Sequence, residues 1–407
     1  MGSHPDLLGG LDDTDQAVAR ALDLSGPARV PPAMAPPASY RTAAPNEIVL
    51  LIGWWLDQMR APSRLVEERL VWFWHDHFAT SLRKVRAPYL LRQQHVTIRQ
   101  HAAGSFADLL HAVAKDPAML VFLDGITNTA GKINENFGRE CLELFTMGRQ
   151  AGYTQTDVVE ASRSFSGWVV NLPDVTPATA LAALGIAPWT ARLVPRRHDA
   201  GVKNLLGRTG AFDLDQAIDV ILEQPATGAF IASKLYRQLV GRTPSHPTAQ
   251  KLGATFARDY QVRHLVEAIV ADPAFTADDA VRSRVRTPVE KLVGLLQAAR
   301  AGPTTVAPRP TAAANALRLI NYLPFLPPNV GGFPDGTLLL GPHDLVTAFD
   351  LLDALGAPPP GYRSVSDLLA RFGVFDVTST TKRVLDGEPD RSRRFALAAM
   401  APEFAVA

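Results

Sequence analysis

Two histidines flank an aspartate within an aromatic stretch of the chain. His75, Asp76 and His77 follow Trp74 directly, and the run from residue 71 to 78 reads VWFWHDHF. Before this run, apolar residues recur at three- and four-residue spacing, which predicts a helix with one buried face. Burying an imidazole or a carboxylate is costly unless the group is paired, hydrogen-bonded or metal-bound. The pattern therefore indicates either a functional site or a pair of core histidines satisfied by their neighbours.

The spacing of His75 and His77 limits how these two side chains can act. Residues two apart on an ideal helix point about 200° apart, so the pair cannot chelate one ion from one helix face. A shared metal requires the helix to end or distort here, or a strand-like geometry in which the two side chains align. Alternatively, one imidazole faces the site while the other bonds a carboxylate or a carbonyl.

A second candidate segment is the helix expected over residues 134–144. It places Glu140 and Glu143 three positions apart on one face, with Asn136 a turn earlier and Arg139 beside them. Carboxylates at this spacing ligate metals in helical bundles, although those sites pair Glu with His three residues on, and no His follows here. A structural network of ion pairs explains the same residues.

A third candidate is His198, which precedes Asp199 and stands close to Lys203 in a stretch without helical periodicity. Irregular loops carry functional residues more often than regular elements do. His198 can thus complete a site with His75 or His77, or it is a solvated surface histidine.

Composition excludes several classes of function. The 407 residues carry a net charge of +1, which argues against nucleic acid as a partner. The single cysteine, Cys141, excludes an intrachain disulfide and a multi-cysteine zinc site. No apolar run approaches the roughly 18 residues of a membrane span, and no secretory signal is recognisable, so we expect a cytoplasmic protein. Motifs for nucleotide hydrolysis, Rossmann cofactors, zincins and α/β-hydrolases are absent.

The order of elements predicts an all-α fold with one small irregular or β-hairpin insertion around residues 168–207. We expect helices at residues 14–24, 46–59, 63–78, 88–102, 105–115 and 117–123, and again over most of residues 134–165 and 213–301. Thr154 and Asp157 have the spacing of a capping box, and Gly148 suits a helix end. We divide the chain into an N-terminal helix and proline-rich linker (1–43), a helical core (44–350) and a C-terminal helical extension (351–407) packed on that core. The last group of helices is expected to start at His343 and Asp344, near the end of the core, and to continue through the extension.

Several segments together resemble the bacterial DUF1800 family, named as a domain of unknown function. The similarity covers roughly residues 45–350, in which six motifs follow one another in the family's order. Phe333 stands where the family's Gly-Trp-Pro turn carries tryptophan, and the N-terminal opening is shorter than the family's. The resemblance implies a mostly helical fold and brings no established activity. The matching segments are residues 72–78, 134–144, 152–158, 166–168, 198–207 and 327–334.

These observations lead to three functional hypotheses. The first is a metal-dependent enzyme, with oxidoreductase chemistry favoured over hydrolysis, acting on a small organic substrate at a composite His/carboxylate site. Iron, zinc or copper suits such ligands. Its rivals are a non-catalytic helical scaffold or binding protein, and a metal-free acid–base enzyme that uses His75 and Asp76. The expected catalytic residues are His75, His77, His198 and Arg139; the expected metal ligands are His75, His77, Glu140, Glu143 and His198, with Asp76 as an alternative carboxylate, in a pocket lined by Trp72, Trp74 and Trp168.

Overall fold

Helices dominate the structure, as the sequence predicts. The computed structural model describes residues 16, 19, 23, 29–41, 46–61, 64–175, 183–277, 280, 283–299, 309–339 and 361–406. Within these residues the only sheets are two antiparallel pairs of short strands. The expected first helix (14–24) lies almost wholly outside the described residues, as do His343 and Asp344.

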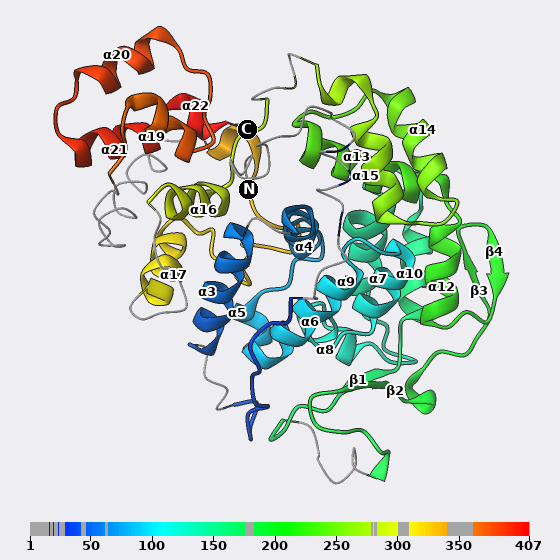
Figure 1. Ribbon diagram of the computed structural model, residues 1–407. Helices are drawn as coiled ribbons and strands as arrows, with labels where there is room; N and C mark the ends of the chain where they lie inside the picture. Colours follow the sequence, from blue (N-terminus) through cyan, green and yellow to red (C-terminus); the bar gives the residue numbers. More distant parts are fainter. Residues whose placement is uncertain are drawn as a thin grey trace.

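The first group of helices surrounds α4, which carries the aromatic motif and lies near the middle of the molecule (Figure 1). Helix α4 packs against α3 and α6, and the polar residues that precede α7 and α8 cap them: Ser105 accepts from the Asp108 amide and Asp116 from the Met119 amide. The elements are α3 (Glu47–Arg60), α4 (Leu65–His77), α5 (Leu82–Val85), α6 (Pro88–His101), α7 (Phe106–Ala114), α8 (Pro117–Phe122) and the 3₁₀ turn η1 (Gly125–Thr127).

The expected helix at residues 134–144 is regular only in its first part. It forms α9 (Asn136–Glu140) and then widens into a π-helical segment, η2 (Cys141–Thr146). Thr146 Oγ1 donates to the Cys141 carbonyl within this segment over 2.6 Å. Gly148 follows with a φ of +86°, which fits its predicted place at the helix end. The predicted capping box of Thr154 and Asp157 opens α10 (Gln155–Ser164).

The predicted non-helical insertion (168–207) contains three of the four described strands, and the fourth, β4, begins just after it. Strand β1 (Trp168–Val170) pairs with β2 (Ala191–Leu193), and β3 (Lys203–Leu205) pairs with β4 (Arg208–Gly210). The 3₁₀ turn η3 (Pro195–Arg197) joins the two hairpins and ends at His198. The insertion thus places His198 on a loop, as expected.

The remaining elements are again helical, and the last four form a group at one end of the molecule beside α16 (Figure 1). The Arg286 amide donates to the Ala405 carbonyl over 2.9 Å, and its guanidinium lies 4.8 Å from the Phe404 ring centre. These contacts attach the C-terminal group to the core. The elements are α12 (Leu214–Leu222), α13 (Pro225–Val240), α14 (His246–Phe256), α15 (Val262–Val270), η4 (Pro273–Phe275), α16 (Pro288–Ala298), α17 (Arg309–Leu319), η5 (Gly336–Leu339), α19 (Val365–Arg371), α20 (Ser379–Gly387), α21 (Arg391–Ala399) and α22 (Pro402–Ala405).

One large hydrophobic cluster extends from α3 to α22 and contains Trp72, Phe73 and Trp74 of the aromatic motif. None of the described helices combines the length and the apolar character that crossing a membrane requires. The motif is therefore an internal part of the fold, and its polar groups must find partners inside it.

Candidate functional site

Helix α4 remains helical through His77, so the two histidines of the motif point to different neighbours. Nε2 of His75 accepts a hydrogen bond from the Phe325 amide over 3.1 Å. Its ring lies 5.0 Å from the Trp55 ring centre and 4.6 Å from that of Phe325. Burial in this aromatic surrounding lowers the pKa of His75 to about 3, so the imidazole is neutral and anchors the loop after α17.

The second histidine, His77, uses both ring nitrogens. Its Nε2 lies 3.0 Å from the Phe145 carbonyl, and Lys234 Nζ lies 2.9 Å from its Nδ1. Because a carbonyl can only accept and an ammonium can only donate, the ring is the neutral tautomer with its proton on Nε2. Burial and the Lys234 charge hold the pKa of His77 well below its usual range, although the bond to Phe145 acts in the opposite direction.

Asp76 lies between the histidines and remains partly exposed. Its Oδ1 accepts from the Phe333 amide over 2.7 Å, while Oδ2 accepts no hydrogen bond from the described residues. Gly332 permits this approach, since a Cβ at that position would lie 2.4 Å from Oδ1. Burial raises the pKa of Asp76 to about 6, against the lowering effect of the Phe333 amide and of Lys234. Asp76 thus combines a raised pKa with one oxygen that has no hydrogen-bond partner among the described residues.

Lys234 of α13 bonds His77 and interacts electrostatically with Asp76. Burial lowers its pKa, while the negative charges of Asp76 and Asp335 raise it. Asp76 and Lys234, both within the described part of the chain, influence each other's pKa without forming a direct ion pair. Only one Nζ–H bond of Lys234 has an acceptor among the described residues, namely His77 Nδ1. Oδ2 of Asp76 and the remaining Nζ–H bonds of Lys234 thus have no hydrogen-bond partner among the described residues.

The charged side chains of α9 and η2 lie near one another, but they form ion pairs with residues close by in the sequence. Glu143 forms an ion pair with Arg149, and Arg139 bonds Glu135 over 2.8 Å. Burial raises the pKa of Glu140, and the neighbouring Glu143 carboxylate adds to this effect. Glu140 and Glu143 thus interact as expected from their spacing, whereas Arg139 belongs to a surface ion pair.

His198 is held against β1 by its neighbours in the insertion. Its Nδ1 lies 3.1 Å from the Ser166 carbonyl, and Asp199 pairs with Arg163 over 2.8 Å. Gly167, with a φ of +95°, allows this closeness because a Cβ there would lie 2.8 Å from the His198 amide nitrogen. Lys203 is buried and donates to the Asp199 carbonyl over 2.5 Å. These groups fasten the loop.

The structure does not gather the expected metal ligands. Within the residues that it describes, which include all five expected ligands, no three His, Cys, Asp or Glu side chains form a group that could hold a metal ion. The physical reason is the partnering given above, which directs His75, His77 and His198 to separate backbone groups. Two of the tryptophans expected to line the site are packed against other aromatic rings: Trp72 stacks on Phe333 at 5.8 Å and Trp74 on Phe106 at 5.4 Å.

Two groups inside the fold were missed by sequence reasoning. Lys234 is half-buried and carried no motif, and only its place among the apolar residues of α13 could have indicated that it is partly enclosed. Glu68 is fully buried and forms a bidentate pair with Arg99 at 2.7 and 2.8 Å, with the Trp55 indole donating over 3.0 Å. The sequence did indicate that Glu68 is buried, because it stands four residues before Trp72 and seven before His75 on the same helix face.

Comparison with known proteins gives one result. A family model described as "Protein of unknown function (DUF1800)" matches residues 10–406. No curated protein and no solved structure matches the chain.

Proposed function

Because the chain belongs to the DUF1800 family, whose description assigns no reaction, we propose from its own geometry that it is a metal-independent acid–base enzyme for a small organic substrate. Asp76 is the general base, and Lys234 is the cationic donor that stabilises negative charge on the substrate. His77 is a positioning residue, since its Nδ1 holds Lys234 Nζ at 2.9 Å.

The observation that carries the proposal is that Asp76 and Lys234 influence each other electrostatically, while Oδ2 of Asp76 and the remaining Nζ–H bonds of Lys234 have no hydrogen-bond partner among the described residues. A general base works best when its pKa lies near the working pH, and the pKa of Asp76 is raised to about 6. A direct ion pair would neutralise both groups. Their separation instead supports a substrate group between the carboxylate and the ammonium.

The reaction class that suits these groups is proton abstraction beside a carbonyl. Oδ2 of Asp76 takes the proton, the C–H electron pair moves into the carbonyl system, and the developing oxyanion accepts hydrogen bonds from the Lys234 ammonium. Such donors act most strongly in a partly desolvated site. Return of the proton to the same or a neighbouring atom completes an exchange or an isomerisation.

The scaffold hypothesis is the second candidate, and one observation favours it. Several polar groups of α4 already have internal partners, as His75, His77 and Glu68 illustrate. Under this hypothesis Asp76 is only the anchor of the Phe333 turn. The metal-dependent hypothesis is weaker than both, because it needs ligands that lie in separate surroundings.

The first experiment titrates Asp76 directly by NMR with ¹³C-labelled aspartate, assigned with Asp76→Asn. We expect a pKa near 6. Removing the Lys234 charge in Lys234→Met should raise the pKa of Asp76 further, whereas Asp335→Asn should lower it, because these two charges act in opposite directions. An ordinary carboxyl pKa that neither variant moves would exclude an acid–base pair.

The second experiment follows solvent deuterium exchange into a panel of small carbonyl compounds, with a chelator present. The wild type should catalyse exchange of at least one compound, and Asp76→Asn should slow it by about 100-fold or more. The exposed Asp108 supplies the control Asp108→Asn, which should leave the rate unchanged. Exchange that disappears in chelator would favour the metal-dependent hypothesis instead.

A further inference from the structure

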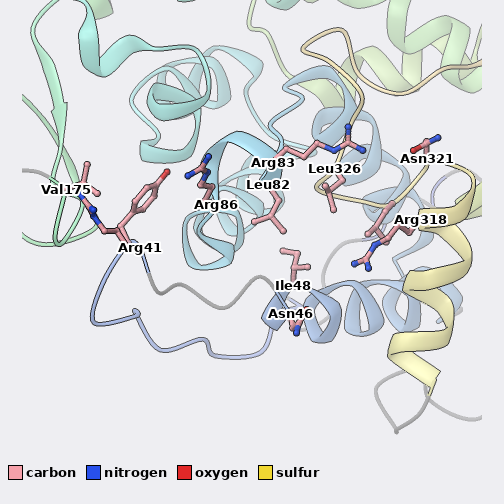
Figure 2. A pocket seen from close by; sticks show the side chains of 12 residues that line it. Arg41, Asn46, Ile48, Leu82, Arg83, Arg86, Val175, Arg318, Asn321 and Leu326 are labelled. Carbon is pink, nitrogen blue, oxygen red and sulfur yellow. The ribbon is translucent and has the colours of Figure 1, made fainter.

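A separate cavity of about 860 Å³ opens between α3, α5, the end of α17 and the segment around Tyr40 (Figure 2). This volume falls within the range of small-molecule sites in proteins. The cavity uses none of the residues of the acid–base site.

The charged side chains described around the cavity are all positive. Among the described residues its lining includes Arg41, Arg83, Arg86 and Arg318 and contains no aspartate or glutamate. Within the described part of the chain, none of the four guanidinium groups has an ion-pair or hydrogen-bond partner. Other arginines here are commonly paired, as Arg99 is with Glu68. Four unpaired arginines around one cavity create a positive field that attracts an anion.

The arginines are spread along the cavity rather than gathered at one point. Figure 2 shows Arg41 at one end and Arg318 at the other, with Arg86 and Arg83 between them. The Arg86 charge also reaches Tyr40, where it opposes the rise that burial causes in the pKa of the phenol. A single small anion would engage only part of this row.

The middle of the cavity is apolar. Leu82 and Ile48 point toward one another between the charged ends, and Leu326 lies beside them (Figure 2). Leu82 and Ile48 are buried, so this apolar surface belongs to the core packing. An apolar centre with cationic groups on both sides fits a ligand with an apolar body and separated acidic groups.

We propose that this cavity binds an elongated organic anion with at least two acidic groups, such as carboxylates, sulfonates or phosphates, on an apolar body. A small molecule suits the observations better than nucleic acid, because the arginines line a concave site and the whole chain carries a net charge of only +1. The proposal is independent of the acid–base site, and its test requires no catalytic activity.

The test is a fluorescence titration with bis-anilinonaphthalene sulfonate, an aromatic dianion. Uncharged N-phenyl-1-naphthylamine serves as the control for apolar binding alone. We expect the dianion to bind the wild type, and the double variant Arg83→Gln/Arg86→Gln to raise its Kd by about tenfold or more. The double variant Arg41→Gln/Arg318→Gln, which changes the two ends of the cavity, should also raise the Kd. The matched control is Arg258→Gln/Arg383→Gln, which removes the same charge from exposed residues outside the cavity and should leave the Kd unchanged.

Three outcomes would overturn the proposal. The first is a Kd that neither cavity variant changes, which would place the dianion elsewhere. The second is equally tight binding of the uncharged naphthylamine, which would reduce the site to an apolar groove. The third is tighter binding of a short single-stranded oligonucleotide that both cavity variants abolish, which would make nucleic acid the ligand. Thermal unfolding of each variant checks that it folds; because all four arginines are exposed, we expect unchanged melting temperatures.

Discussion

Lys234 donates a hydrogen bond to Nδ1 of His77 over 2.9 Å, and this contact connects α13 to the C-terminal end of α4. The opposite nitrogen of the same ring donates to the Phe145 carbonyl in the π-helical segment η2. One neutral imidazole therefore joins three elements that are far apart in sequence. A π-helical turn leaves carbonyls outside the regular hydrogen-bond pattern, and His77 provides a partner for one near such a turn.

The first prediction concerns the stability that His77 provides. His77→Ala removes a buried ring that stacks on Phe73 at 5.9 Å and leaves the Phe145 carbonyl without its donor. We expect the free energy of unfolding to fall by about 3–5 kcal/mol, measured by urea denaturation. The exposed His264 provides the control His264→Ala, which should change it by less than about 0.5 kcal/mol. A loss below about 1 kcal/mol in His77→Ala would show that the ring does not hold these elements together.

The second prediction tests the close approach of Gly332 to Asp76. Both Gly332 and Gly131 have positive φ, at +92° and +77°, so alanine at either position carries backbone strain of about 1 kcal/mol. At Gly332 the added Cβ would also lie 2.4 Å from Asp76 Oδ1, whereas at Gly131 it meets nothing within 4 Å. Gly332→Ala should therefore lower the free energy of unfolding by at least about 2 kcal/mol more than Gly131→Ala does, and it should displace the Phe333 amide from Asp76. Equal losses in urea denaturation would contradict this contact.

The helical fold could be predicted from local patterns, because the apolar periodicity and the capping residues of a helix lie within its own sequence. The helix start at Thr154 and the helix end at Gly148 were predicted from capping rules, and the structure confirms both. The lack of helical periodicity in residues 168–207 identified the strand-containing insertion. Helical geometry also predicted correctly that His75 and His77 cannot meet on one face.

The partners of these side chains did not follow from local patterns, because they come from distant segments. His75 meets Phe325, and His77 meets Lys234, across 250 and 157 residues of sequence. The π-helical widening after Glu140 also left no recognisable mark in the sequence. A motif of polar residues in an apolar stretch thus indicated burial correctly, but it could not distinguish backbone partners from metal ions.

The third prediction is a pH dependence of stability that comes from His75. Its pKa is about 3 in the folded protein against 6.5 in the unfolded chain, so the unfolded chain binds the proton first as the pH falls. The contribution of this group to stability is fully present above pH 6.5 and is lost as the pH falls toward 3. Between about pH 7 and pH 5 the loss amounts to about 2 kcal/mol.

His75→Gln keeps an oxygen that can accept from the Phe325 amide but removes the titrating group. Urea denaturation at several pH values should therefore show a weaker loss of stability on acidification than in the wild type. Some loss should remain, because the pKa values of His77 and His95 are also lowered by burial. The exposed His246 supplies the control His246→Gln, which should retain the wild-type slope. If the pH dependence of the free energy of unfolding is the same in His75→Gln as in the wild type, the pKa of His75 is not lowered by folding and the prediction is wrong.

The fourth prediction concerns Glu68, the fully buried carboxylate that α3, α4 and α6 share. Arg99 binds both of its oxygens at 2.7 and 2.8 Å, and the Trp55 indole donates to one of them over 3.0 Å. Glu68→Gln preserves the shape but leaves two largely buried guanidinium groups without this counter-charge, those of Arg99 and of Arg29, which lies 3.3 Å from Glu68. Breaking a buried pair in this way costs about 3–5 kcal/mol, which urea denaturation can measure.

The matched control for Glu68→Gln is Glu267→Gln, because Glu267 also bonds an arginine, Arg263, over 3.1 Å, but on the exposed face of α15. Solvent screens that pair, so its loss should cost less than about 0.5 kcal/mol. A double variant, Glu68→Gln with Arg99→Met, should recover part of the lost stability, since it removes the more deeply buried of the two charges that Glu68 compensates and leaves only that of Arg29. If the double variant is as unstable as the sum of the two single variants, the pair contributes through packing rather than through charge.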